Sequence, residues 1–206
     1  MIARAAAAVS LRSRRRKMEQ FLRLIQPTEE TTVVDVGVAD TPFGVGQGRA
    51  LTHNFFEALY PWPERITAVG NVPLDRFAQA FPQIPRVVAD GRDLPFADGE
   101  FDVAFSNAVV EHVGGRTDQE RFVLELCRVA KRVFVTTPNR LFPLDPHTLL
   151  PVVHWLPDGR RPRRLDGVRP LYARELRSLF PYPVRIVNTG LTLIAVGGSA
   201  PSAERS

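Results

Sequence analysis

Short β-branched runs that alternate with helical stretches constrain this chain more than any other feature of its sequence. The runs that predict strands lie at residues 32–37, 66–70, 86–89, 101–106 and 132–137. Helical stretches separate them at about residues 49–59, about residues 74–80 and residues 117–131. Strands that are joined through helices form right-handed crossovers. The sequence therefore predicts a largely parallel sheet.

The C-terminal part of the chain predicts a different pairing. Residues 138–170 are rich in Pro and Arg and have no regular period, and a helix is predicted at 172–180. Two strands follow at 183–188 and 191–197, with a Thr-Gly turn between them. Strands joined this briefly must pair antiparallel. The predicted fold is α/β, a doubly wound sheet of seven strands with five parallel strands and a C-terminal antiparallel hairpin.

Charge divides the chain into three parts. Residues 1–26 carry 7 basic and 1 acidic side chains, residues 27–158 carry 11 and 18, and residues 159–206 carry 9 and 3. Near the start, Met18, Phe21, Leu22 and Ile25 have the spacing of one helix face. We therefore expect a basic N-terminal segment with a capping helix at 1–26 and one domain at 27–200. Within that domain an insertion is expected at about 138–170, and a disordered tail at 201–206.

Composition excludes several classes of protein. No run approaches the ~20 apolar residues of a membrane-spanning helix. Cys127 is the single cysteine, so neither an intramolecular disulfide nor a cysteine-based zinc site is expected, and we predict no metal. The acidic middle argues against a nucleic-acid partner, whereas the basic ends allow peripheral contact with an anionic membrane. These features predict a cytoplasmic protein that can associate with a membrane surface.

Polar and small residues follow the predicted strands. The segment DVGVAD (35–40) ends the first strand, DGRDLPF (90–96) follows the third, and SNAVVEHV (106–113) ends the fourth. In open parallel sheets, ligands bind beyond the carboxyl ends of the strands. We therefore expect the functional site at these segments.

Together these segments resemble class I S-adenosylmethionine-dependent methyltransferases, in the small-substrate branch called type 11. The resemblance spans roughly residues 31–140. Its most specific part is VVADGRDLPFADGEFDVAFSNAVVEHV (87–113), which is similar to the family block D-A-x-x-L-P-F-x-D-x-x-F-D-x-V. The resemblance implies a Rossmann-like sheet and S-adenosyl-L-methionine as cofactor. It also implies in-line methyl transfer to an oxygen or nitrogen of a small or lipid-linked acceptor, such as a saccharide.

The resemblance implies roles for individual residues. Residues after the first strand would border the methionine part of the cofactor, and Asn71 would hydrogen-bond the ribose. Residues after the third strand would bind adenine, and those at the end of the fourth would face the sulfonium. The implied cofactor-binding residues are Asp35, Gly37, Asn71, Asp90, Gly91, Arg92, Ser106 and Asn107.

Two positions depart from the family pattern. Ala39 and Thr41 stand where the first loop normally has its second and third glycines. The second strand ends in Gly70-Asn71 rather than in the acidic residue that holds the ribose hydroxyls. These departures leave an alternative open, in which the chain is a catalytically inactive methyltransferase-like binding protein.

A catalytic base is needed only when the acceptor must lose a proton. His112, beside Glu111, is the first candidate, and the same Glu-His step lies by the acceptor in related quinone O-methyltransferases. His147 in the insertion is the next candidate, with His154. The alternative for each is a hydrogen-bonded or packed histidine without a chemical role.

The insertion is where we expect the acceptor to be selected. Its apolar part, residues 149–155, suits a pocket or a membrane surface, and the arginines at 160, 161, 163 and 164 suit a phosphate. The alternative is a solvated basic loop. The glycine-rich run at 44–48 lies too far after the first strand for a phosphate-binding loop and lacks its Lys-Ser/Thr, so we expect a lid or a helix entry there.

Overall fold

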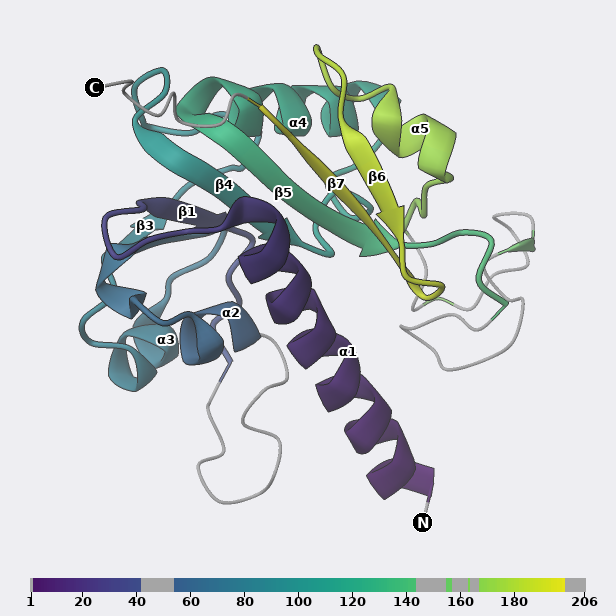
Figure 1. The fold of residues 1–206 in the computed structure, drawn as a ribbon, viewed down its shortest axis with the longest axis horizontal. Coiled ribbons are helices and arrows are strands. Elements are labelled where there is room, and N and C mark those ends of the chain that lie inside the picture. The colour runs from purple at the N-terminus through teal and green to yellow at the C-terminus, as the bar shows by residue number, and fades with distance from the viewer. Residues whose placement is uncertain (1, 42–53, 144–154, 157–162, 164–166, 199–206) are drawn as a thin grey trace. The chain divides into compact units, whose positions relative to one another are not determined.

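The predicted fold class is confirmed by a computed structural model, which describes residues 2–41, 54–143, 155–156, 163 and 167–198. A seven-stranded sheet has the order β3-β2-β1-β4-β5-β7-β6 (Figure 1). The chain divides into two units, Met1–Asp90 and Gly91–Ser206, which are described in turn.

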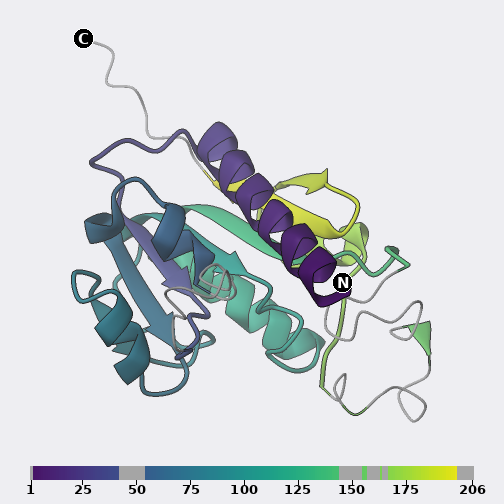
Figure 2. The same cartoon turned by 90° about the horizontal axis from the view of Figure 1, so that it is seen from below.

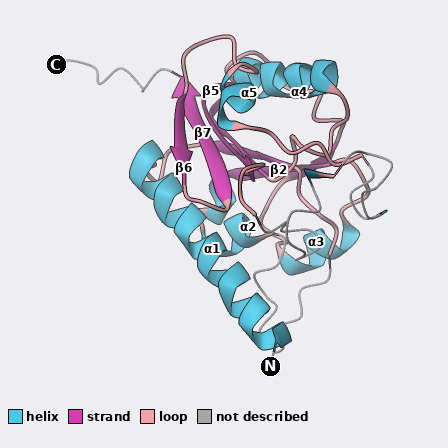
Figure 3. Cartoon of the chain, turned by 90° about the vertical axis from the view of Figure 1, so that its right-hand side faces the viewer, coloured by secondary structure: helices cyan, strands magenta, loops and turns pink. Residues whose placement is uncertain are grey.

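The first unit contains the three parallel strands β1 (Val33–Val36), β2 (Ile66–Gly70) and β3 (Arg86–Val88). The short helix α2 (Phe55–Leu59), the 3-10 turn η1 (Pro63–Arg65) and the helix α3 (Asp75–Ala80) connect them. In two views α2 and α3 lie on the same side of these strands (Figures 1 and 3). Every residue of β1 is buried, which explains its continuous apolar run around a single acid. The predicted helix at 49–59 corresponds to α2, with residues 49–53 outside the described part.

The helix α1 (Ile2–Ile25) precedes these strands as one continuous helix (Figure 2). The apolar spacing predicted a helix only from Met18 onward, but the helix begins near the N-terminus. Alanine and arginine, which dominate the earlier residues, are among the strongest helix formers. Met18, Phe21 and Ile25 are buried, and the Phe21 ring lies edge-on to Phe56 of α2 at 5.0 Å between centroids. No helix in the described residues has the length and apolarity needed to cross a membrane.

The second unit contains β4 (Phe101–Asn107), β5 (Ala130–Pro138), β6 (Arg185–Asn188) and β7 (Thr192–Gly198). β4 and β5 are parallel, and β7 pairs antiparallel with both β5 and β6. The helices α4 (Arg116–Val129) and α5 (Ala173–Arg177) contact these strands from the same side (Figure 3). The predicted hairpin is therefore present.

Two helix boundaries differ from the prediction. The helix expected at 117–131 ends at Val129, because Ala130 is already extended and pairs with Phe101 of β4. The helix expected at 172–180 is the shorter α5. In both cases the apolar period continues past the helix end, because the next residues are buried by other elements.

Phenylalanine rings fill the interior of the second unit. Phe105 of β4 and Phe134 of β5 are stacked, with 5.7 Å between ring centroids, and both are almost completely buried. Removal of a buried ring loses its transfer free energy and leaves a cavity.

We expect Phe105→Ala to lower the free energy of unfolding by about 3 to 5 kcal/mol, because the variant loses the transfer free energy of the ring and leaves a cavity in the core. Urea unfolding followed by circular dichroism measures the change. Leu124→Ala, on the exposed face of α4, is the matched control and should change stability by less than about 0.5 kcal/mol. Equal losses in both variants would contradict this view of the core.

Candidate functional site

Side chains hold the loop after β1 in place of the missing glycines. The amide of Asn54 accepts a hydrogen bond from the Ala39 N–H at 3.1 Å and donates one to the Ala39 carbonyl at 2.8 Å. An Asp40 carboxylate oxygen accepts hydrogen bonds from the N–H groups of Arg76 and Phe77 in the first turn of α3, at 2.7 and 2.9 Å. The loop is therefore held at Ala39, one of its two unusual positions, and at Asp40, the residue before the other. Sequence reasoning missed Asn54 and Asp40, because neither partner is near in sequence.

Two glycines in this region, Gly37 and Gly70, stand where a larger residue would not fit the backbone or the packing. Gly37 has a φ of 113°, a conformation that L side chains rarely adopt, and its N–H donates to the Val69 carbonyl at 2.9 Å. A Cβ at Gly70 would lie 2.9 Å from the Val38 carbonyl oxygen and 2.9 Å from Leu74. The acid that usually ends the second strand has no room here, so the departure at Gly70 follows from packing. Asn71 comes next and is exposed.

Two carboxyl groups are buried together at the end of β1. Asp35 is 6% exposed, and Glu57 of α2, which is 3% exposed, faces it. Both carboxyl oxygens of Glu57 are buried, and the groups that act on them are its own backbone and the side chain of Asp35. The sequence predicted Asp35 as a site residue but gave no signal for Glu57.

Burial favours the protonated form of both acids. It raises the pKa of Asp35 well above its ordinary value, and the charge of Glu57 and a hydrogen bond to Glu57 raise it further. Burial likewise raises the pKa of Glu57 to about 7, while a hydrogen bond from its own backbone and then one with Asp35 act in the opposite direction. Two buried carboxylates side by side repel each other, so the pair holds a proton near neutral pH.

The segment after β3 carries three predicted adenine-binding residues. Asp90 is exposed, whereas Gly91 and Arg92 are partly buried. The side chain of Arg92 is engaged elsewhere in the second unit, because its Nη1 donates to Asp118 at 2.8 Å and to the Val113 carbonyl at 3.4 Å. The Arg92 side chain is therefore held by these two partners, and its predicted role in binding adenine stays a prediction.

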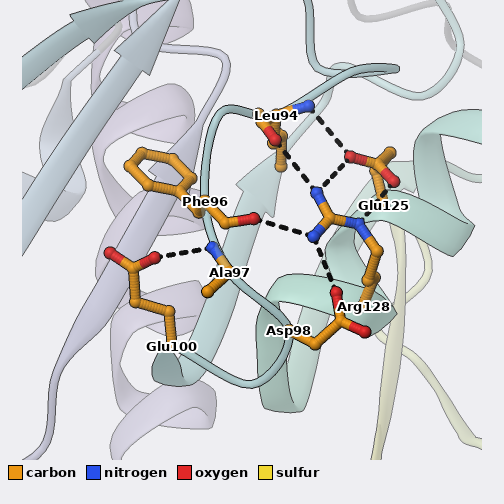
Figure 4. A network of polar contacts seen from close by, with 7 residues as sticks. All are labelled: Leu94, Phe96, Ala97, Asp98, Glu100, Glu125 and Arg128. Atoms are coloured by element: carbon orange, nitrogen blue, oxygen red, sulfur yellow. Dashed lines mark hydrogen bonds and ion pairs between the residues drawn. The ribbon is translucent and has the colours of Figure 1, made fainter.

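Arg128 of α4 clamps the rest of this segment (Figure 4). Its guanidinium donates to the carbonyl oxygens of Leu94 and Phe96, at 2.9 and 2.7 Å, and to the Asp98 carboxylate at 2.9 Å. Glu125 accepts from the same guanidinium and from the Leu94 N–H. In the segment that corresponds to the family block L-P-F-x-D, two carbonyl groups and the aspartate therefore accept hydrogen bonds from one arginine, which holds the segment in place.

The chain turns sharply at the end of β4. Ser106 is completely buried, and Asn107 accepts a hydrogen bond from Thr136 Oγ1 at 2.8 Å. The next residue, Ala108, has a φ of 56°, which is unusual for a residue with a side chain. Its N–H donates to the Thr136 carbonyl at 2.9 Å. Such strain is often found at functional positions, and here it directs the chain toward Glu111 and His112.

Glu111 and His112 lie together beyond this turn. The Glu111 side chain is completely buried, and its Oε2 accepts a hydrogen bond from Thr137 Oγ1 of β5 at 2.9 Å. The His112 side chain is 44% exposed, with its Nε2 4.0 Å from Glu111 Oε1. A buried acid therefore faces an accessible imidazole. Sequence reasoning did not find Thr137, and His147 and His154 lie outside the described residues, as does the glycine-rich run at 44–48.

Both ends of the expected insertion are anchored near Glu111. The Arg169 N–H donates to the Glu111 carbonyl at 2.7 Å, and the Arg140 N–H donates to the Leu171 carbonyl at 3.2 Å. The Arg140 guanidinium lies over the Tyr172 ring at 4.8 Å, and Trp155 Nε1 donates to the Arg140 carbonyl at 2.6 Å. Residues from both ends of the insertion thus meet at the carboxyl ends of β4 and β5.

Comparison with known proteins agrees with this arrangement. The family model described as "Methyltransferase domain" matches residues 43–133, which include the segments after β3 and β4. This part of the chain is therefore similar to a methyltransferase domain. The predicted resemblance to S-adenosylmethionine-dependent methyltransferases is confirmed, as are the predicted enzyme class and class of cofactor. A comparison with curated proteins finds no match.

Solved structures share the methyltransferase fold at low sequence identity. The N-methyltransferase NodS from Bradyrhizobium japonicum WM9, in complex with S-adenosyl-l-homocysteine, is 14% identical with a TM-score of 0.59, over 89% of this chain and 85% of that one. The 1,6-didemethyltoxoflavin-N1-methyltransferase from Burkholderia thailandensis, with bound substrate and S-adenosylhomocysteine, is 16% identical with a TM-score of 0.54, over 96% and 77%. The [4+2]-cyclase SpnF is 16% identical with a TM-score of 0.52, over 84% and 60%.

The buried acid pair predicts a pH dependence of stability. Because the pKa of Glu57 is higher in the folded state than in the unfolded chain, its contribution is fully present at acidic pH and is lost as pH rises toward about 7. We expect Glu57→Gln, which keeps the shape of the protonated acid, to flatten this decline between about pH 5 and pH 8. Urea unfolding across that range measures it. Glu64→Gln, at an exposed residue, should retain the wild-type slope, and a slope unchanged by Glu57→Gln would contradict the assignment.

Proposed function

We propose that this chain binds S-adenosyl-L-methionine and transfers its methyl group to an oxygen or nitrogen of a small or lipid-linked acceptor. The observation that carries the proposal is the buried Glu111 beside the accessible His112, at the end of a strand whose sequence matches the methyltransferase family. The bound cofactor supplies a methyl group on a positively charged sulfur, so the protein's main task is to align the two reactants.

His112 is proposed as the base that takes the acceptor proton. Glu111 stabilises the imidazolium that forms, because its buried carboxyl lies 4.0 Å from Nε2, and Thr137 orients it from β5. Glu111 is thus a positioning residue and His112 the catalytic residue. His147 is a second candidate base, because it lies in the insertion that is expected to contact the acceptor.

The proposed cofactor contacts follow the family pattern except at the ribose. Asp35 and Gly37 suit the methionine part, the Asp90 carboxylate with the Gly91 and Arg92 amides suits adenine, and Ser106 and Asn107 suit the sulfonium end. Asn71 takes the ribose, since Gly70 has no room for an acid. No basic side chain of the described residues acts on the buried acids Asp35 and Glu57, so this pair fits a cationic ligand such as this cofactor.

The acceptor class is proposed from the anchored ends of the insertion. Leu141, Trp155 and Tyr172 expose 63%, 48% and 37% of their surface around Arg140. Aromatic and apolar side chains next to arginine suit the interface of a membrane or the lipid part of an acceptor. We therefore propose a substrate-facing insertion at about 138–170 and a cytoplasmic reaction that takes place at a membrane surface when the acceptor is lipid-linked.

The alternative function is an inactive methyltransferase-like binding protein. The altered first loop and the missing ribose acid favour it, and the cyclase SpnF has the same fold without being named a methyltransferase. Two observations favour an adapted cofactor site instead. Asn54 hydrogen-bonds the loop at Ala39, and the neighbours of Gly70 leave no space for an acidic side chain.

Cofactor retention separates these two functions. In equilibrium dialysis the purified full chain should retain labelled S-adenosyl-L-methionine in a saturable way. Asp90→Ala should weaken retention at least about tenfold, because it removes a hydrogen bond that a charged acceptor makes to the adenine amino group. Asp93→Ala, an exposed neighbour, is the matched control and should bind as the wild type does. Retention that Asp90→Ala leaves unchanged would remove this residue from the site, and no retention by the wild type would favour the alternative.

The base is tested by transfer of labelled methyl groups into a small-molecule extract of cells that express the protein. We expect His112→Gln to lower the transfer rate by roughly 10² to 10⁴, the usual contribution of a positioned base, with cofactor retention unchanged. Glu111→Gln should lower it less, because the imidazole remains in place. Full activity of His112→Gln would show that His112 only packs against the loop.

A further inference from the structure

The helix α1 is basic, and neither the family pattern nor the proposed chemistry uses it. It carries 7 basic side chains and 1 acidic side chain, whereas residues 26–90, which follow it in the same unit, carry 4 and 8. We propose that the outer face of α1 docks the protein onto an anionic lipid surface through electrostatic contact with lipid phosphates. The inference goes beyond the proposed function, because it depends neither on cofactor binding nor on which acceptor is methylated.

The two faces of α1 have opposite character. Met18, Phe21 and Ile25 are buried, and the Phe21 ring packs against Phe56 of α2. In Figures 1 and 3, α2 lies along one side of α1, and no described element of the same unit covers the other side. Positions separated by three or four residues share a helix face. The exposed residues that have this spacing on the side opposite Phe21 are Arg12, Arg15, Arg16, Glu19 and Arg23.

The arginines of this outer face keep their charges available. Within the described part of the chain, no carboxylate forms an ion pair with Arg12, Arg15 or Arg16, although Glu19 is three residues from one of them and four from another. Arg23 donates a hydrogen bond to the neutral amide of Gln20 at 2.6 Å. Glu19 is the only acid in the helix, so the outer face has a net positive charge.

Charge complementarity selects an anionic partner, and the packing of α1 determines how it binds. Clusters of roughly four to eight Lys or Arg on a helix are typical of binding to acidic lipid head groups. A helix that inserts into a membrane does so with its apolar face, but that face of α1 contacts α2 through Phe21, Phe56 and Tyr60. The contact is therefore electrostatic, with the outer face of α1 on the lipid head groups.

A nucleic acid fits this face less well than a lipid surface does. Proteins that bind single strands combine basic residues with aromatic rings on which the bases stack. Phe21 is the only aromatic residue of α1, and it is buried on the opposite face. The excess of acids in residues 26–90 also opposes a nucleic acid that wraps around this unit.

Co-sedimentation of the full chain with lipid vesicles tests the inference. We expect the wild type to bind vesicles of phosphatidylcholine with about one third phosphatidylglycerol, and to bind pure phosphatidylcholine at least about tenfold more weakly. Binding should weaken as salt rises from about 0.05 M to about 0.5 M, because exposed charges are screened. Equal binding to both kinds of vesicle, or to neither, would overturn the inference.

The decisive variant is R12Q/R15Q/R16Q, which removes three charges and keeps good helix formers at exposed positions. Each lost arginine should weaken binding to the anionic vesicles about fivefold, so this variant should bind roughly 10²-fold more weakly. R12K/R15K/R16K keeps the charges and should bind as the wild type does. Its failure to bind would indicate bidentate recognition of a single anion, which contradicts docking on a lipid surface. Circular dichroism shows whether each variant is folded.

Three exposed arginines elsewhere in the same unit supply the matched control. R65Q/R76Q/R86Q loses the same charge but keeps α1 intact, and it should bind the anionic vesicles within about twofold of the wild type. Equal losses in the two glutamine variants would show that only net charge matters.

Two further results would also overturn the inference. One is wild-type binding by R12Q/R15Q/R16Q, and the other is tighter binding of the wild type to a labelled DNA duplex or single-stranded RNA than to the anionic vesicles. The cofactor is absent from these mixtures, so the proposed function is tested separately by cofactor retention.

Discussion

The free-energy cost of burying polar side chains determines how the polar residues of β1, β4 and β5 are arranged. β1 is entirely buried and β4 and β5 are mostly buried, yet Asp35, Ser106, Thr136 and Thr137 stand among their buried residues. A buried polar group must find a partner or change its protonation. Thr136 and Thr137 do the first, by donating to Asn107 and Glu111. Asp35 does the second: burial raises its pKa, and the neighbouring Glu57 carboxyl raises it further.

The same physical rule separates what the sequence predicted from what it did not. Buried strands such as Ile66–Gly70 are apolar runs bounded by turns, so the strands and the hairpin were visible in the sequence. The start of α1 was not, because its first turns carry no apolar period and form a helix through alanine and arginine propensity alone. The ends of α4 and α5 depended on where neighbouring elements bury the next residue, which local spacing does not record.

Site residues followed a similar division. Asp35, Asp90 and His112 stand in segments that resemble a family, so the sequence predicted them as site residues. Glu57, Asn54 and Thr137 contribute through contacts with distant residues, and nothing in NFFEALY (54–60) or RVFVTT (132–137) marks them. The apparent loss of the glycine loop and of the ribose acid has a structural explanation. Asn54 and Asp40 fix the loop, and Gly70 is required by the Val38 carbonyl.

Fold and chemistry remain separate questions for such a chain. Structures of 14% to 16% identity share its fold, and they include two methyltransferases and a cyclase, so the activity depends on the groups at the strand ends. Here those groups are an acid beside an accessible imidazole in the second unit and a proton-sharing acid pair in the first. The most specific property of the first unit is that burial raises the pKa of both acids, that of Glu57 to about 7.

Nuclear magnetic resonance of the side-chain carboxyl carbons tests that property directly. One glutamate signal that Glu57→Gln removes should titrate near neutral pH, because burial raises the pKa of Glu57 to about 7. If every glutamate and aspartate signal instead titrates in the ordinary acidic range, with or without ligand, the buried pair holds no proton and the account of this site is wrong.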